Sequence, residues 1–155
     1  MIKEIHVFDM DGCIVDSSHR YRTAACGKKI DLQYWLDNEY RAMQDTLLPL
    51  ADKYQAMLKN PEIYVIIATS RVLNAPDLEF IETVLGQPNK LISRNGRNDW
   101  RSGTGVKAPQ LRKLFSLKQF KNAKKWFYED NQKVLDGVCA LTGMTPIFIP
   151  SNQGH

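Results

Sequence analysis

The sequence has few cysteines and no long apolar run. Its three cysteines, Cys13, Cys26 and Cys139, lie far apart and form no CxxC pair, so the sequence favours neither a disulfide framework nor a zinc site. No stretch approaches the roughly 18 consecutive apolar residues that a membrane span requires. Charged residues stand near the amino terminus, where a secretion signal would be apolar. We therefore expect a cytoplasmic protein with no membrane partner.

The chain also lacks internal repeats, low-complexity segments and linkers. It has no GxxxxGK motif followed by serine or threonine, so Gly103 and Gly105 do not belong to a nucleotide-binding P-loop. Its 155 residues, of which 43% are hydrophobic and 25% charged, are enough for one globular domain spanning residues 1–155. The 21 lysines and arginines exceed the 17 acidic residues, and this surplus favours an anionic partner. Nothing in the sequence indicates an obligate protein partner.

Apolar runs alternate with amphipathic stretches along the chain. This alternation predicts an α/β domain with a Rossmann-like open parallel sheet. Residues 13–44 are surplus to the alternation, and we interpret them as a small helical cap, or lid, inserted after the first strand. The expected strands are residues 5–8, 63–68, 90–93, 126–128 and 145–149, and the expected helices cover residues 47–58, 78–85, 111–115 and 134–141.

The clearest functional signal is the segment VFDMDG at residues 7–12. It places Asp9 and Asp11 where a buried strand ends, which is where open α/β folds bind their ligands. Gly12 would let the backbone turn sharply and approach a ligand closely. Taken alone, the motif is equally typical of solvated turn aspartates.

Three further segments place polar side chains at the ends of predicted elements. A hydroxyl at a strand end can donate a hydrogen bond to a phosphoryl oxygen, and a lysine behind a flexible glycine-rich loop can supply a cation. The segments are ATSR (68–71), with Thr69, Ser70 and Arg71; GTGVK (103–107), with Lys107; and FYEDN (127–131), with Glu129 and Asp130.

Convergence of the acidic residues would demand a cation. If Asp9, Asp11, Glu129 and Asp130 share one crevice, each like-charge pair at about 4 Å costs on the order of 4 kcal/mol at an effective dielectric near 20. Oxygen ligands without a soft donor favour a hard ion, and a site that keeps water and substrate oxygens favours Mg²⁺ over Ca²⁺. We therefore expect Mg²⁺ as the cofactor.

The four motifs, in this order, resemble those of the haloacid-dehalogenase-like (HAD) superfamily of hydrolases. Within it, the sequence looks most like the 3′-phosphatase domain of phage-type polynucleotide kinases, above all in the segment from Phe127 to the final apolar run. One departure is Cys13, which stands where that family usually has a threonine after Asp-Gly. The resemblance implies a phosphatase that acts on a phosphorylated substrate.

The resemblance also implies a role for each motif residue. Asp9 would attack phosphorus to form an aspartyl-phosphate and would bind Mg²⁺ through its second oxygen. Asp11 would offer its backbone carbonyl to the metal, and its carboxyl group would act as general acid and base, which requires a raised pKa. Thr69 and Lys107 would bind phosphoryl oxygens.

The resemblance assigns less specific roles to the remaining acidic and basic residues of the motifs. Asp130 would bind the metal directly, with Glu129 behind it. Arg71 could contact substrate or fix its loop through a salt bridge. Gly12 and Ser70 complete the expected substrate-binding residues near the strand ends.

Three functions remain open. Arg94, Arg97 and Arg101, with Trp100 among them, suit a nucleic-acid strand, which favours a phosphatase for 3′-phosphate ends of nucleic acid. The same residues are also compatible with solvated surface charge. The alternatives are a phosphatase for nucleotides or other small phosphomonoesters, and a nucleic-acid-binding or regulatory module with a vestigial site.

Overall fold

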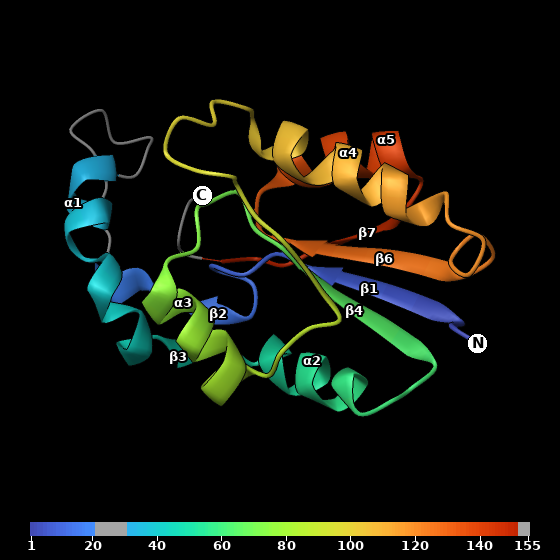
Figure 1. Ribbon diagram of the computed structural model, residues 1–155, viewed down its shortest axis with the longest axis horizontal. Coiled ribbons are helices and arrows are strands. Elements are labelled where there is room, and N and C mark those ends of the chain that lie inside the picture. Colours follow the sequence, from blue (N-terminus) through green and yellow to red (C-terminus); the bar gives the residue numbers. More distant parts are fainter. Residues whose placement is uncertain (21–30, 152–155) are drawn as a thin grey trace.

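A single parallel sheet forms the centre of the computed structural model, which describes residues 1–20 and 31–151 (Figure 1). Its five strands lie in the order β5-β4-β1-β6-β7, with all neighbours parallel. The strands are β1 (Glu4–Phe8), β4 (Ile63–Ala68), β5 (Lys90–Ile92), β6 (Lys124–Glu129) and β7 (Thr145–Phe148). All five lie where the sequence predicts strands, and the predicted Rossmann-like α/β class is confirmed.

Helices cover both faces of this sheet (Figure 1). On one face lie α4 (Gly103–Phe115) and α5 (Gln132–Thr142), and on the other lie α2 (Leu50–Leu58), α3 (Ala75–Phe80) and the π-helical turn η3 (Ile81–Leu85). None of the helices in residues 1–20 and 31–151 combines the length and the apolar character needed to cross a membrane.

Side-chain alternation along the central strands divides the core into two layers. In β1, Val7 packs in the cluster under α4 and α5, whereas Phe8 packs with Tyr54 of α2 and Phe80 of α3. Successive strand residues point to opposite faces, so both faces must be apolar. This explains why β1 and β4 have nearly continuous apolar sequences.

The segment after the first strand is only partly helical. It contains the short strand β2 (Val15–Asp16), the 3₁₀ turns η1 (Ser18–Arg20) and η2 (Glu39–Gln44), and the helix α1 (Leu32–Asp37). The η2 turn packs on α3, beside the carboxyl ends of the strands (Figure 1). Part of the predicted cap, residues 21–30, lies outside the described residues, as do residues 152–155. The role of residues 13–44 as a lid stays a prediction.

Two predicted helix boundaries are wrong for identifiable reasons. The helix expected from residue 47 begins at Leu50, because β3 (Thr46–Leu47) pairs antiparallel with β2. The segment from Gly103 to Gly105, expected as a flexible loop, is the first turn of α4. There the hydroxyl of Ser102 accepts a hydrogen bond from the Gly105 backbone N–H at 3.0 Å, which stabilises the helix end.

Candidate active site

Parallel strands bring the sequence motifs to one edge of the sheet. Asp9 directly follows β1, Thr69 follows β4, Glu129 ends β6 and Asp130 comes next. Because β1 lies between β4 and β6, the three motifs meet at adjacent carboxyl ends. Lys107 enters from α4, which crosses one face of the sheet.

Three carboxylates form a compact cluster at this edge. Oxygens of Asp9, Glu129 and Asp130 all lie within 4.8 Å of one another. One oxygen of Asp130, Oδ2, accepts a hydrogen bond from the Ser151 hydroxyl at 2.8 Å, whereas the buried Oδ1 has no hydrogen-bond partner. A buried carboxylate oxygen without a donor is costly, and a cluster of three carboxylates suits a hard cation. The cluster therefore fits the Mg²⁺ ion that the sequence predicts.

The protonation of the cluster reflects this crowding. Burial, followed by the charge of Asp9, raises the pKa of Glu129 to about 9. The same two causes raise the pKa of Asp130 to about 8. Without a cation, the cluster therefore holds protons near neutral pH, and a bound metal must displace them.

The Lys107 ammonium supplies positive charge beneath the cluster. Its Nζ donates to Asp9 Oδ1 at 3.1 Å and to Glu129 Oε2 at 3.0 Å, and the side chain is fully buried. Burial by itself lowers the pKa of Lys107, but the charges of Asp9 and Glu129 outweigh it and raise the pKa above its usual value. Lys107 thus offsets part of the repulsion between two carboxylates.

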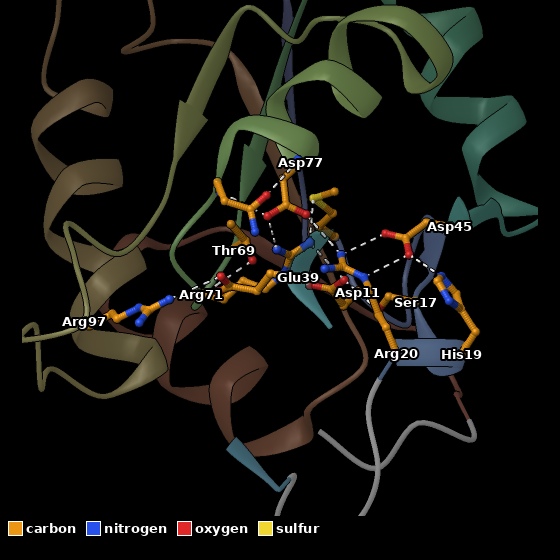
Figure 2. A network of polar contacts seen from close by, with 12 residues as sticks. Asp11, Ser17, His19, Arg20, Glu39, Asp45, Thr69, Arg71, Asp77 and Arg97 are labelled. Carbon is orange, nitrogen blue, oxygen red and sulfur yellow. Dashed lines mark hydrogen bonds and ion pairs between the residues drawn. The ribbon is translucent and has the colours of Figure 1, made fainter. Parts of the chain in front are cut away.

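Asp11 lies in a different electrostatic environment, which Figure 2 shows. Arg71 Nε donates to its Oδ2 at 2.6 Å and the Ser17 hydroxyl to its Oδ1 at 2.8 Å. Burial alone raises the pKa of Asp11, but Arg71, with help from Arg20 and Ser17, holds it below the usual value. The raised pKa expected for Asp11 is therefore wrong for this state, because Arg71 stabilises the carboxylate.

Arg71 and Arg20 are joined by a buried acid that the sequence analysis missed. Asp77 Oδ2 accepts from Arg71 Nη1 at 2.7 Å and its Oδ1 from Arg20 Nη2 at 3.0 Å (Figure 2). Arg20 also donates two hydrogen bonds to Asp45. The Asn74-x-x-Asp77 spacing is a recognisable capping box, which marks a helix start but not this contact.

A cavity of about 350 Å³ opens above these groups. It is lined by Asp9, Asp11, Thr69, Ser70, Arg71, Glu129 and Asp130 from the predicted motifs, and by Leu32, Trp35, Gly103, Asn131 and Val134. The predicted nucleophile, hydroxyls and acids therefore share one space with an apolar wall. Four carboxylates, two hydroxyls and a guanidinium facing one cavity can bind a phosphoryl group and an accompanying cation.

A comparison with known families decides the relationship. The model of the family described as bacteriophage T5 5′-deoxynucleotidase matches residues 1–98. The chain belongs to this family. The match includes Asp9, Asp11, Thr69 and Arg71, whereas Glu129 and Asp130 lie beyond it. No curated protein matches the sequence.

Solved structures similar to this deoxynucleotidase-family chain share its fold. A chain in the Pnkp1/Rnl/Hen1 complex aligns with a TM-score of 0.69 and 18% identity, covering 98% of this chain and 47% of its own length. This chain thus spans less than half of that protein. The HAD domain of effector protein Lem4 from Legionella pneumophila has a TM-score of 0.59, 14% identity and coverage of 98% and 88%.

A hydrolase from Streptococcus pneumoniae TIGR4 is similar over nearly its full length. Its TM-score is 0.58, with 15% identity and coverage of 98% of this chain and 95% of its own. At identities of 14–18%, these three structures show a shared fold, and the family relationship rests on the match over residues 1–98.

Three arginines predicted to bind substrate form hydrogen bonds or ion pairs with other residues of this deoxynucleotidase-family protein. Arg94 Nε donates to the Ser70 carbonyl at 2.6 Å and its Nη1 to the Asp99 carbonyl at 2.7 Å. Arg97 pairs with Glu39 at 3.4 Å, and Arg101 pairs with the Asp99 carboxylate. These contacts fix the loop after β5, and a direct role in substrate binding stays a prediction.

Gly12 provides a first test of this site. It has a φ of +80°, and a Cβ there would overlap a carboxylate oxygen of Asp130. We expect Gly12→Ala to lower the free energy of unfolding by about 1–3 kcal/mol, and to weaken Mg²⁺ binding and phosphatase activity by displacing Asp130. Denaturant unfolding, calorimetric Mg²⁺ titration and steady-state kinetics measure these effects.

The matched control is Gly143→Ala. Gly143 has a φ of +75° but open space around it. The Gly143→Ala variant should therefore be less stable than the wild type but equally active. Equal activity of the two variants would contradict the close packing of Gly12 on Asp130.

The raised pKa values of Glu129 and Asp130 predict a pH-dependent stability. The folded protein binds protons at these two carboxyl groups more tightly than the unfolded chain does, because unfolded carboxyl groups have pKa values of about 4. The Tm of the metal-free protein should therefore fall as pH rises from about 7 to about 9. His6, whose pKa burial lowers, titrates below this window.

Added Mg²⁺ should reverse the trend and raise Tm more at the upper end of the window, because fewer protons then compete for the site. Thermal unfolding across this range, with and without Mg²⁺, measures both effects. Asp130→Asn should flatten both responses, and an unchanged metal-dependent rise in that variant would argue against the cluster as the metal site.

Asp77 provides a third test. Asp77→Asn removes the charge that Arg20 and Arg71 share, so we expect a stability loss of about 3 kcal/mol and a lower kcat, since Arg71 loses one of its two anchors. Glu79→Gln, an exposed change in the same helix, is the control and should alter neither. Wild-type stability of Asp77→Asn would show that the buried network contributes little.

Proposed function

We propose that this protein is a Mg²⁺-dependent phosphomonoesterase that hydrolyses deoxynucleoside 5′-monophosphates through an aspartyl-phosphate intermediate. The single observation that supports this most is the cavity in which Asp9, Asp11, Thr69 and Arg71 face one space beside the three-carboxylate cluster. The name of the matched family, 5′-deoxynucleotidase, supports the choice of substrate.

In this proposal, Asp9 is the nucleophile. A carboxylate oxygen of Asp9 forms a bond to phosphorus while the bond from phosphorus to the ester oxygen breaks. The leaving alkoxide takes a proton from Asp11, and the released product is the nucleoside. Water then attacks the aspartyl-phosphate, its proton passes to Asp11, and phosphate leaves with Asp9 regenerated.

Asp9, Asp130 and Glu129 would hold the metal, together with the Asp11 backbone carbonyl as the HAD resemblance implies. A bound Mg²⁺ would neutralise charge between the nucleophile and a dianionic phosphate. Thr69 lines the cavity and is nearly fully buried, so its hydroxyl is placed to bind a phosphoryl oxygen. Lys107 positions Asp9 by donating a hydrogen bond to its Oδ1 at 3.1 Å.

Asp11 must gain a proton before it can act as the acid. Arg71 holds it as a carboxylate in the absence of substrate. A phosphoryl dianion in the cavity gives Arg71 a second anion to bind, which weakens its hold on Asp11 and lets the pKa of Asp11 rise. Arg71 thus combines the two roles that the sequence left open, loop fixation and substrate contact.

The cavity volume favours a small substrate. At about 350 Å³, it lies near the lower end of the roughly 300–1,000 Å³ typical of small-molecule sites. The three arginines of the loop after β5 are each paired within the protein, so among the described residues this loop offers a nucleic-acid backbone no unpaired arginine. Both observations support a mononucleotide over a strand.

Removal of a 3′-phosphate from nucleic-acid ends is the second candidate. A chain of the Pnkp1/Rnl/Hen1 RNA repair complex is similar over 98% of this chain, with a TM-score of 0.70 and 17% identity. The exposed Trp100 near the cavity could stack on a terminal base of a strand as well as on a mononucleotide.

A substrate panel tests the choice. Deoxynucleoside 5′-monophosphates, 3′-monophosphates, a 3′-phosphorylated oligonucleotide and an aryl phosphate are compared with and without Mg²⁺. We expect the highest kcat/KM for the 5′-monophosphates, and no turnover without metal. Preference for the oligonucleotide, with rates that fall steeply as salt rises, would favour the 3′-end function instead. No metal-dependent release from any substrate would reject the phosphatase proposal.

The nucleophile has its own test. Asp9→Asn should reduce turnover by at least about 10³-fold, because an amide cannot attack phosphorus, while circular dichroism remains that of the folded protein. Asp136→Asn, an exposed change on α5, serves as the control and should be fully active. Substantial turnover by Asp9→Asn would remove the covalent mechanism.

A further inference from the structure

A second cavity adjoins the catalytic one and has no part in the chemistry described above. Its volume is about 390 Å³, and it shares Leu32, Trp35, Ser70 and Arg71 with the catalytic cavity. The two cavities are therefore adjacent, with Arg71 on the border of both. Trp100 lines the second cavity but not the first.

Trp100 is unusual because a large aromatic side chain is exposed on a fixed loop. Its relative exposure is 85%. The carbonyls on either side of it, of Asp99 and Arg101, both accept hydrogen bonds from Arg94 Nη1, and Arg94 Nε binds the Ser70 carbonyl. The Arg94 guanidinium therefore links the backbone around Trp100 to the segment after β4 that contains Thr69 and Arg71.

The other indole of this cavity is already engaged. Trp35 is buried, and the guanidinium carbons of Arg20 and Arg71 lie 4.5 Å and 5.1 Å from its ring centroid. Trp35 therefore lines the cavity and contacts two guanidinium groups, whereas the exposed Trp100 ring is accessible to a ligand. The Arg97–Glu39 ion pair joins the same loop to η2 beside Arg71 (Figure 2).

We propose that the second cavity binds the nucleobase of the substrate, with Trp100 as the stacking surface. This inference rests on the proposed nucleotidase function. A phosphoryl group in the catalytic cavity would leave the nucleoside beside Arg71, which lines both cavities. Stacking on an aromatic ring accepts any base because each has a π-face, and a preformed loop limits the entropy lost on binding.

The test compares a nucleotide with the same molecule lacking its base. Trp100→Ala should lower kcat/KM for deoxyadenosine 5′-monophosphate about tenfold, mainly through KM, as loss of one stacking contact predicts. Hydrolysis of deoxyribose 5-phosphate should not change. Trp100→Phe should restore most of the nucleotide activity, because a phenyl ring still stacks.

Tyr40→Ala is the matched control. Tyr40 is an exposed aromatic residue of η2, with a relative exposure of 71%, and lines neither cavity. The Tyr40→Ala variant should leave the kcat/KM for both substrates unchanged. Quenching of tryptophan fluorescence by deoxyadenosine 5′-monophosphate, smaller in Trp100→Phe than in the wild type, would provide a readout independent of turnover.

The possible results separate the two proposals. Equal losses for both substrates in Trp100→Ala, or no loss for the nucleotide, would overturn the base site and leave the nucleotidase function intact. A wild type that hydrolyses deoxyribose 5-phosphate as well as the nucleotide would also overturn the base site. A wild type active on an aryl phosphate but on no deoxynucleoside 5′-monophosphate would reject the proposed function, and the base site with it.

Discussion

The crowding of carboxylates at the ends of β1 and β6 is the constraint on which the site depends. Asp9, Glu129 and Asp130 lie close enough for their oxygens to share one ligand, and each pair of charges at about 4 Å would cost roughly 4 kcal/mol at an effective dielectric of 20. One buried ammonium, Lys107, offsets part of this cost. The remainder is relieved by protons in the metal-free protein and would be relieved by a cation when one binds.

The two aspartates of the DxD motif have opposite environments despite standing two residues apart. Asp9 faces the acidic cluster and Lys107, whereas Asp11 faces Arg71, Ser17 and, more distantly, Arg20. In the proposed mechanism, this separation would allow one carboxylate to serve as a nucleophile and the other to exchange protons, since the charges around each can change independently. Asp77 links Arg71 to the start of α3. Asp11 and Arg71 are therefore held in place by the fold as well as by their contact with each other.

The second cavity depends on the loop after β5, which supplies much of its lining. The sequence predicts that the arginines of this loop bind substrate, and in the structure they also hold the loop in place. What they present is one exposed indole beside the catalytic cavity. These contacts make the loop a rigid support for the Trp100 ring, and a direct role of its arginines in binding substrate stays a prediction.

The parallel α/β class, the five strands and the order of the four motifs follow from the sequence alone, because apolar runs of strand length followed by polar residues are local patterns. The sequence also indicated that Asp9, Thr69 and Asp130 would meet, since parallel strands end at a common edge. Three further features required the folded structure: Ser102 begins α4 and makes Gly103 helical, Arg71 lowers the pKa of Asp11, and Asp77 joins two arginines. These outcomes depend on contacts between residues up to 60 positions apart, and no local pattern encodes the distance or the charge of such a partner.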